Sequence, residues 1–172
     1  MKPFVKYGLI AAGLSILWSL IGYLLGNETQ ESLKWVSNII MISISVLCFR
    51  GAIAEVRASQ NGFISFKEAF RVSFMTGLIA AIINLGFTYV YFTYINPEFI
   101  GFIIEKAQQD MIDKGMGDEQ VEMAIKMQSK FMSPPIMSAF AFIFSLIFNV
   151  IIGLIMAAIM KKENPDEVFG GK

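Results

Sequence analysis

The chain has 172 residues, of which 55% are hydrophobic and 16% are charged, and its formal net charge is zero. A soluble domain usually has about 25% charged residues, so this composition argues against an ordinary soluble globular protein. The sequence contains no histidine, which removes the commonest general base and the commonest metal ligand. It also contains no P-loop, dinucleotide-binding or hydrolase motif. We therefore expect a membrane protein that is not an enzyme and that holds no metal or cofactor.

Three long stretches of the sequence carry no charge, and a fourth is charged only at its rims. A run of roughly 18 or more apolar residues is long enough to cross a bilayer core of about 30 Å as a helix. The sequence thus predicts an all-α integral membrane four-helix bundle that forms a single membrane domain over residues 1–172. The expected spans lie at about residues 7–25, 33–54, 69–95 and 136–160.

Small and polar side chains recur within these expected spans. In the first span they alternate at spacings of four and three residues, at Gly8, Ala12, Ser15, Ser19, Gly22 and Gly26. Small residues let helices approach closely in lipid, where association depends on packing. The most polar groups deep in the other spans are Asn84 and Asn149, and Gly153 follows one helical turn later. We interpret all of these as helix-packing residues; the alternative is that the two asparagines line a polar pathway.

The charges of the connecting segments are unevenly divided between the two sides of this topology. Cytoplasmic loops carry an excess of Lys and Arg, so the more basic side is expected to be the inner one. That side has nine cations and five acids, and the other side has five cations and nine acids. Both termini, including a short tail at 161–172, and the central loop are therefore predicted to be cytoplasmic.

The central loop is followed by an aromatic and basic segment. Asn61 and Gly62 form a turn signal, and Ser65 with Glu68 has the spacing of a helix-capping box. Aromatic side chains favour the headgroup zone, and cations favour anionic lipid. We therefore expect an interfacial helical lead-in to the third span, formed by Gly62, Phe63, Phe66, Lys67, Phe70 and Arg71.

The segment 97–133 is the longest stretch expected outside the membrane. Apolar residues recur at helical spacing on both sides of the sequence "KGMGD", which predicts two amphipathic helices with Asp118 as the N-cap of the second. The prediction is an extracytoplasmic helical hairpin between spans three and four. It is expected either to lie on the outer leaflet or to cap the bundle.

Three parts of the sequence resemble a known family. They are "KYGLIAAGLSI" near the start, "NGFISFKEAFRVSF" in the centre and the Met-rich segment that ends in "SKFMSPPIMSAF". Together they resemble the bacterial membrane family named domain of unknown function 4199, over essentially Tyr7 to Lys162. The resemblance implies a four-span bacterial inner-membrane protein. It implies no activity and no functional residues.

Two functions are compatible with these features. The first is a non-enzymatic accessory or structural membrane subunit that acts through contacts with the lipid bilayer and with a membrane protein partner or further copies of itself. The alternative is a small transporter or channel that uses the intramembrane Asn and Ser groups. The sequence shows no basic stripe of the kind that binds nucleic acid, so no nucleic-acid partner is expected.

Overall fold

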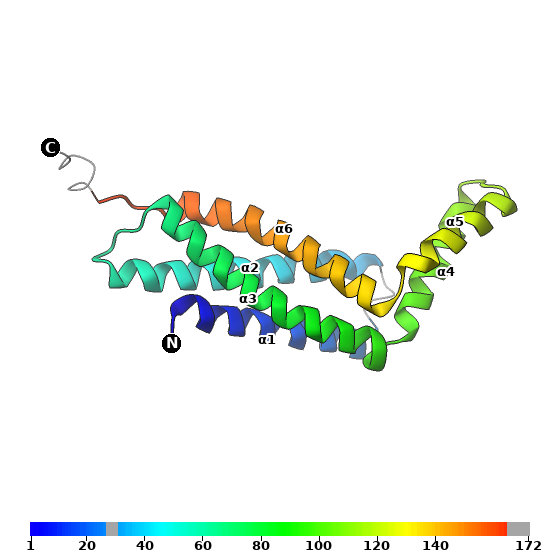
Figure 1. The fold of residues 1–172 in the computed structure, drawn as a ribbon, viewed down its shortest axis with the longest axis horizontal. Coiled ribbons are helices and arrows are strands. Elements are labelled where there is room, and N and C mark those ends of the chain that lie inside the picture. The colour runs from blue at the N-terminus through cyan, green and yellow to red at the C-terminus, as the bar shows by residue number, and fades with distance from the viewer. Residues whose placement is uncertain (27–30, 165–172) are drawn as a thin grey trace. The chain divides into compact units, whose positions relative to one another are not determined.

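The computed structural model describes residues 1–26 and 31–164 of the chain, and this described part is helical with no β-strand. Six α-helices follow one another along the sequence, and a short π-helix, η1, directly extends the third (Figure 1). Their bounds are α1 Pro3–Leu24, α2 Glu31–Ser59, α3 Phe66–Val90, η1 Tyr91–Ile95, α4 Glu98–Asp113, α5 Asp118–Phe131 and α6 Pro134–Met160. The prediction of an all-α fold is confirmed.

Four of these helical segments are long and apolar enough to cross a membrane: Pro3–Leu24, Trp35–Ser59, Phe66–Ile95 and Pro134–Met160. These four candidate spans correspond to the four predicted ones, and every helix begins earlier than expected. The second also ends five residues later than the predicted 54, because Glu55 and Arg57 lie within the helix. A charged side chain at the end of a span is tolerated because it can reach the interface.

The ends of the helices follow from local sequence. The Glu68 amide donates to Ser65 Oγ at 3.3 Å, so the predicted cap of α3 is confirmed. Gly115 adopts a positive φ of 76° just after α4, where a left-handed conformation closes the helix. The predicted N-cap of α5 was wrong, because Gly117 occupies that position and Asp118 is the first helical residue. Asp118 instead places its negative charge in the first turn, where it interacts favourably with the positive end of the helix dipole.

The chain divides into two compact units. Unit 1 consists of Met1–Asn84 with Phe144–Lys172, and unit 2 consists of Leu85–Ile143. In unit 1, α1, α2, the first part of α3 and the last part of α6 run alongside one another (Figure 1). The start of α1, the end of α2, the start of α3 and the end of α6 share one end of this unit, since Lys6 contacts Glu55 and Ile64 pairs with Lys162. We call it the basic end.

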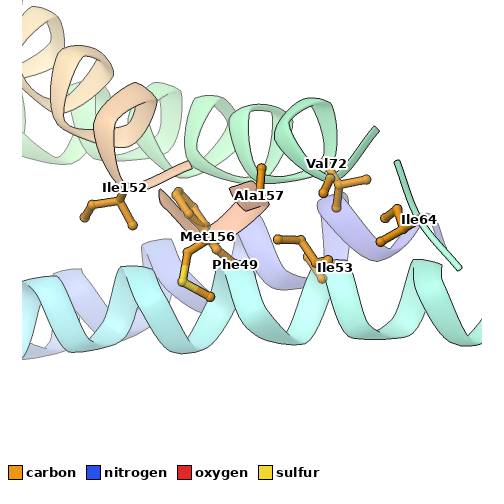
Figure 2. Close-up of a cluster of buried hydrophobic side chains, with 9 residues drawn as sticks. Phe49, Ile53, Ile64, Val72, Ile152, Met156 and Ala157 are labelled. Atoms are coloured by element: carbon orange, nitrogen blue, oxygen red, sulfur yellow. The ribbon is translucent and has the colours of Figure 1, made fainter. Parts of the chain in front are cut away.

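The largest buried cluster of unit 1 lies toward the basic end. Phe49 and Ile53 of α2 meet Val72 of α3 and Met156 of α6, and Ile64 of the central loop closes the cluster (Figure 2). Phe49 and Ile53 are almost completely buried. A second, smaller cluster joins the three helices α1, α2 and α3 through Ala11, Ala12, Cys48 and Ala80. Small side chains dominate there, which is how helices come close in lipid.

Unit 2 contains η1, the helical hairpin of α4 and α5, and the flanking ends of α3 and α6. The two predicted helices of the outer segment are thus confirmed, and residues 114–117 separate them. Ile100 of α4 and Val121 of α5 are buried within this unit. The aromatic rings of Phe92 and Phe99 stack with their centroids 6.0 Å apart, which joins η1 to the beginning of α4.

Candidate functional site

The first polar contact inside the bundle joins α1 to α3. Asn84 Nδ2 donates to Ser15 Oγ at 2.9 Å, and Ser15 Oγ also lies 3.2 Å from Asn84 Oδ1. The Ser15 hydroxyl donates in addition to the carbonyl of Ala12, one helical turn earlier. Both side chains are therefore engaged in a contact between two helices. This is the arrangement expected for a helix-packing residue.

The second polar contact joins α6 to α3. Asn149 Nδ2 donates to the carbonyl oxygen of Gly77 at 3.2 Å. A Cβ atom on Gly77 would lie 2.7 Å from Asn149 Cγ, a distance that real Cβ atoms do not show. The glycine is thus what allows the amide of Asn149 to reach the backbone of α3. The same pair of helices meets again at Gly153, where an added Cβ would lie 3.3 Å from Ser73 Cβ.

The predicted small-residue stripe of α1 is partly turned into the bundle. A Cβ on Gly8 would lie 2.8 Å from Ile79 Cβ and 3.0 Å from the carbonyl oxygen of Thr76, so α1 and α3 cross most closely there. Of the other stripe residues, Ala12, Ser15 and Gly22 are buried and Ser19 is half-buried. Gly26 lies beyond the last residue of α1 with a positive φ of 66°, so it belongs to the turn and not to the helix face.

The central loop is tied to the end of α6 by an isolated antiparallel bridge. The Ile64 amide donates to the Lys162 carbonyl at 2.8 Å, and the Lys162 amide donates to the Ile64 carbonyl at 2.9 Å. The ammonium of Lys162 lies 5.3 Å from the centre of the Phe63 ring, within the range of a cation–π contact. Arg57 is also directed to this place, with its guanidinium 3.5 Å from the Met160 carbonyl. Chain segments that are about 100 residues apart are thereby joined at the basic end.

The predicted interfacial motif is divided by the structure. Gly62 has a positive φ of 87° and lies in the turn after α2, as its sequence signal predicted. Phe63 lies next to the bridge residue Ile64 and outside α3, so the expectation that it shares a helix with Phe66 and Phe70 was wrong, because α3 begins only at Phe66. Phe66 is exposed and Phe70 is half-buried against the main cluster. The two cations of the motif, Lys67 and Arg71, are exposed on the first turns of α3.

A polar pair that the sequence analysis missed lies at the same end. Lys6 Nζ lies 2.8 Å from Glu55 Oε2, which joins the start of α1 to the end of α2. The ammonium of Lys6 is also 5.1 Å from the centre of the Tyr7 ring. That ring occupies the space beside Gly51, where a Cβ would collide with it. Only the opposite charges at equivalent depths of two neighbouring spans could have indicated this pair from the sequence.

The side chains that could hold a metal ion include the acidic and thiol groups. Within residues 1–26 and 31–164, no group of three or more Cys, Asp or Glu side chains is placed to hold a metal ion. In the same part of the chain, every fully buried side-chain nitrogen or oxygen has a hydrogen-bond partner. The geometry shows close contacts between helices. It also shows a basic end that is held together by an ion pair and a backbone bridge.

Most of the chain matches one protein family. A model of the family described as "Protein of unknown function (DUF4199)" matches residues 6–162. The chain belongs to this family. The match extends from Lys6, in the ion pair, to Lys162, in the loop bridge, so the matched region contains all the helix contacts described above.

No curated protein and no solved structure matches the chain. The length and composition of the four apolar helices indicate a membrane protein. Its function must therefore be argued from its own contacts.

Proposed function

We propose that the chain is a non-enzymatic accessory or structural subunit of a bacterial cytoplasmic membrane, with both termini and the central loop on the cytoplasmic side. In this role the bundle acts as a fixed body that offers its outward faces to lipid and to a membrane protein partner. The observation that carries the proposal is that the two amides deepest in the spans, Asn84 and Asn149, hold helices together.

The hydrogen bonds of these amides matter because they distinguish a role in helix packing from a role in lining a transport pathway. Transport sites place polar or ionisable groups along a pathway, often where a helix is broken at mid-membrane. Here Asn84 contacts Ser15, and Asn149 contacts the backbone of an unbroken α3 at Gly77. Interhelical hydrogen bonds of this kind add only about 0.6 kcal/mol on average, so they fix helix register more than they add stability.

The outward faces of the spans support contact with lipid and protein. Large apolar side chains point away from the bundle on every span, including Leu17, Ile39, Ile82 and Ile147, each about half exposed or more. The proposed orientation is supported by the cations that gather at the basic end, because Lys and Arg are retained in cytoplasmic loops. Lys67, Arg71, Lys161 and Lys162 are all exposed there.

Photo-crosslinking in native membranes tests the proposal. A photoreactive residue would be placed in turn at Leu17, Ile39, Ile82 and Ile147, one outward position on each span, and at Ser129 in the hairpin as a position away from the spans. After irradiation, mass spectrometry would identify the attached chains. We expect one membrane protein to be captured in stoichiometric amount from one face of the bundle, and not from all four.

Other outcomes would count against the proposal. Capture of copies of the same chain alone would make the protein a homo-oligomer that works without a partner. The transporter hypothesis would then be tested by solute flux in reconstituted vesicles. If Asn84→Leu or Asn149→Leu abolished flux and left assembly intact, the accessory-subunit proposal would be replaced by transport.

A further inference from the structure

Helix α5 has an exposed apolar stripe that the hairpin itself does not cover. Met123, Met127 and Phe131 are spaced four residues apart and are 66%, 62% and 56% exposed, respectively. Residues at this spacing lie on one side of a helix, one above another. We call these three residues the α5 stripe. Large side chains of this kind, aligned and exposed, indicate a surface that meets another apolar phase.

The α5 stripe is distinct from the side of the helix that packs within the hairpin. Val121 is buried, and Ala124 and Ile125 are half-buried, on the side that contributes to the hairpin core. The third side is charged and exposed, and Glu122 and Lys126 lie on it. An ordinary amphipathic helix has one apolar side and one polar side. Helix α5 has two apolar sides, and only one of them is covered by its own chain.

The chain enters the membrane immediately after this stripe. Helix α5 ends at Phe131 and α6, a membrane span, begins at Pro134, so only Met132 and Ser133 lie between them. The three steps from Phe131 to Pro134 bridge no more than about 11 Å even when fully extended. No charged residue occurs between Lys130 and Lys161, so the uncharged stretch that forms the span already begins at Phe131. The stripe therefore leads along the chain directly into the uncharged stretch of α6.

The charges of α5 are graded toward the same junction. Asp118, Glu119 and Glu122 occupy the first half of the helix, whereas Lys126 and Lys130 occupy the second half next to α6. Cations beside an apolar stripe favour the phosphates of lipid headgroups, and acids do not. Of the three stripe residues, Phe131 is thus placed to enter most deeply. Met123 is eight residues away, at a distance of about 12 Å along the helix axis.

We propose that the α5 stripe is a lipid-binding surface that inserts into the outer leaflet around the entry point of α6, with Phe131 deepest and Met123 shallowest. Helices of this type bury their apolar side about 5–10 Å into the boundary between headgroups and acyl chains. Lys126 and Lys130 would bind headgroup phosphates at the edge of the stripe. The insertion rests on α5 and its junction with α6, whereas the choice of the outer leaflet rests on the orientation given under the proposed function.

Spin-label accessibility in reconstituted vesicles tests this inference. In a Cys48→Ala chain, nitroxide labels would be attached to Met127→Cys, to Phe131→Cys and, as a matched control on the charged side of the same helix, to Ser129→Cys. The vesicles would contain phosphatidylethanolamine and phosphatidylglycerol, with molecular oxygen and a nickel chelate present on both sides. Oxygen concentrates in lipid and the chelate stays in water, so the ratio of the two accessibilities reports depth.

We expect a severalfold higher oxygen-to-nickel ratio at position 127 than at position 129, and a higher ratio still at position 131. Equal ratios at positions 127 and 129 would show that the stripe faces water and would overturn the inference. Exclusion of both reagents from position 127 would also overturn it, because a protein surface or a second copy of the chain would then be the occupant.

Discussion

The bundle of unit 1 and the hairpin of α4 and α5 place their side chains differently. In the bundle, small residues and amides lie between the helices beside one cluster of large apolar side chains, and other large apolar residues, such as Leu17 and Ile159, are exposed on the outside. In the hairpin, apolar residues such as Ile100 and Val121 are buried, and most charged residues are exposed. The first pattern suits a solvent of lipid tails, where close packing holds helices together. The second pattern suits water, where the burial of apolar side chains holds helices together.

The comparison teaches that one chain uses two different sources of stability. In unit 1, close approaches between helices, as at Gly8 and Gly77, add to the buried cluster around Ile64. In the hairpin, the α5 stripe is the exception to the aqueous pattern.

The largest effect is expected where the central loop closes the main cluster. Ile64 is only 2% exposed, so Ile64→Ala leaves a cavity and should lower the free energy of unfolding by about 2–5 kcal/mol. Ile112→Ala in the hairpin is the matched control, because Ile112 is 46% exposed. Denaturation in mixed micelles would measure both. Equal losses would show that the loop is not part of the core.

A smaller loss is expected where two helices cross most closely. Gly8→Ala forces Ile79 and the Thr76 carbonyl away from α1 and should cost about 1–3 kcal/mol, as overpacking does. Gly13→Ala on the same helix is the control, since an added Cβ there has no neighbour within 4 Å. The control should unfold at the same denaturant concentration as the parent chain or at a higher one, because alanine favours helix. If both variants lost stability equally, the proposed close crossing would be wrong.

The polar contact between α1 and α3 should contribute less. A double-mutant cycle of Ser15→Ala and Asn84→Ala isolates the hydrogen bond between the two side chains. We expect a coupling energy of about 0.6 kcal/mol, the average for such pairs in membranes. A coupling energy of zero would mean that the two side chains do not interact in the folded protein.

The smallest effect on unfolding is expected from the α5 stripe. Met127→Glu should leave the free energy of unfolding unchanged, since its side chain packs against lipid and not against the bundle. It should nevertheless speed trypsin cleavage at Lys126 and Lys130 in vesicles, because the added charge expels the helix from the leaflet. Ser129→Glu adds the same charge on the polar side of the helix and should not change cleavage. Equal cleavage of both variants would contradict the difference between the two sides of α5.

The ion pair at the basic end permits a test by exchange of charges. Lys6→Glu or Glu55→Lys alone places like charges opposite each other and should lower the unfolding midpoint. The double exchange restores opposite charges, so it should recover part of the loss if the pair at 2.8 Å forms in the folded protein. A double variant no more stable than either single variant would show that the two side chains are not paired.

Much of the fold could be predicted from the sequence because its signals are local. The spans followed from stretches without charge, and the break between α4 and α5 followed from "KGMGD". The cap at Ser65 followed from its spacing to Glu68. Each of these depends on neighbouring residues alone.

The contacts between distant segments could not be predicted in the same way. The bridge between Ile64 and Lys162 involves backbone groups only, so no side-chain pattern marks it. Asn84 and Asn149 were recognised as packing residues, but their partners, Ser15 and the carbonyl of Gly77, depend on how the helices are rotated. In the sequence, the two apolar sides of α5 form one wide apolar side. They can be told apart only when the position of α4 shows which of them is buried.

The proposed topology places the hairpin and the basic end on opposite sides of the membrane. In a Cys48→Ala chain, Ser129→Cys and Ser59→Cys would be exposed to a membrane-impermeant maleimide in intact spheroplasts and again after lysis. We predict that Ser129→Cys is labelled before lysis, and that Ser59→Cys is labelled only after it. Labelling of both positions from the same side would contradict the four-span topology and the functions proposed from it.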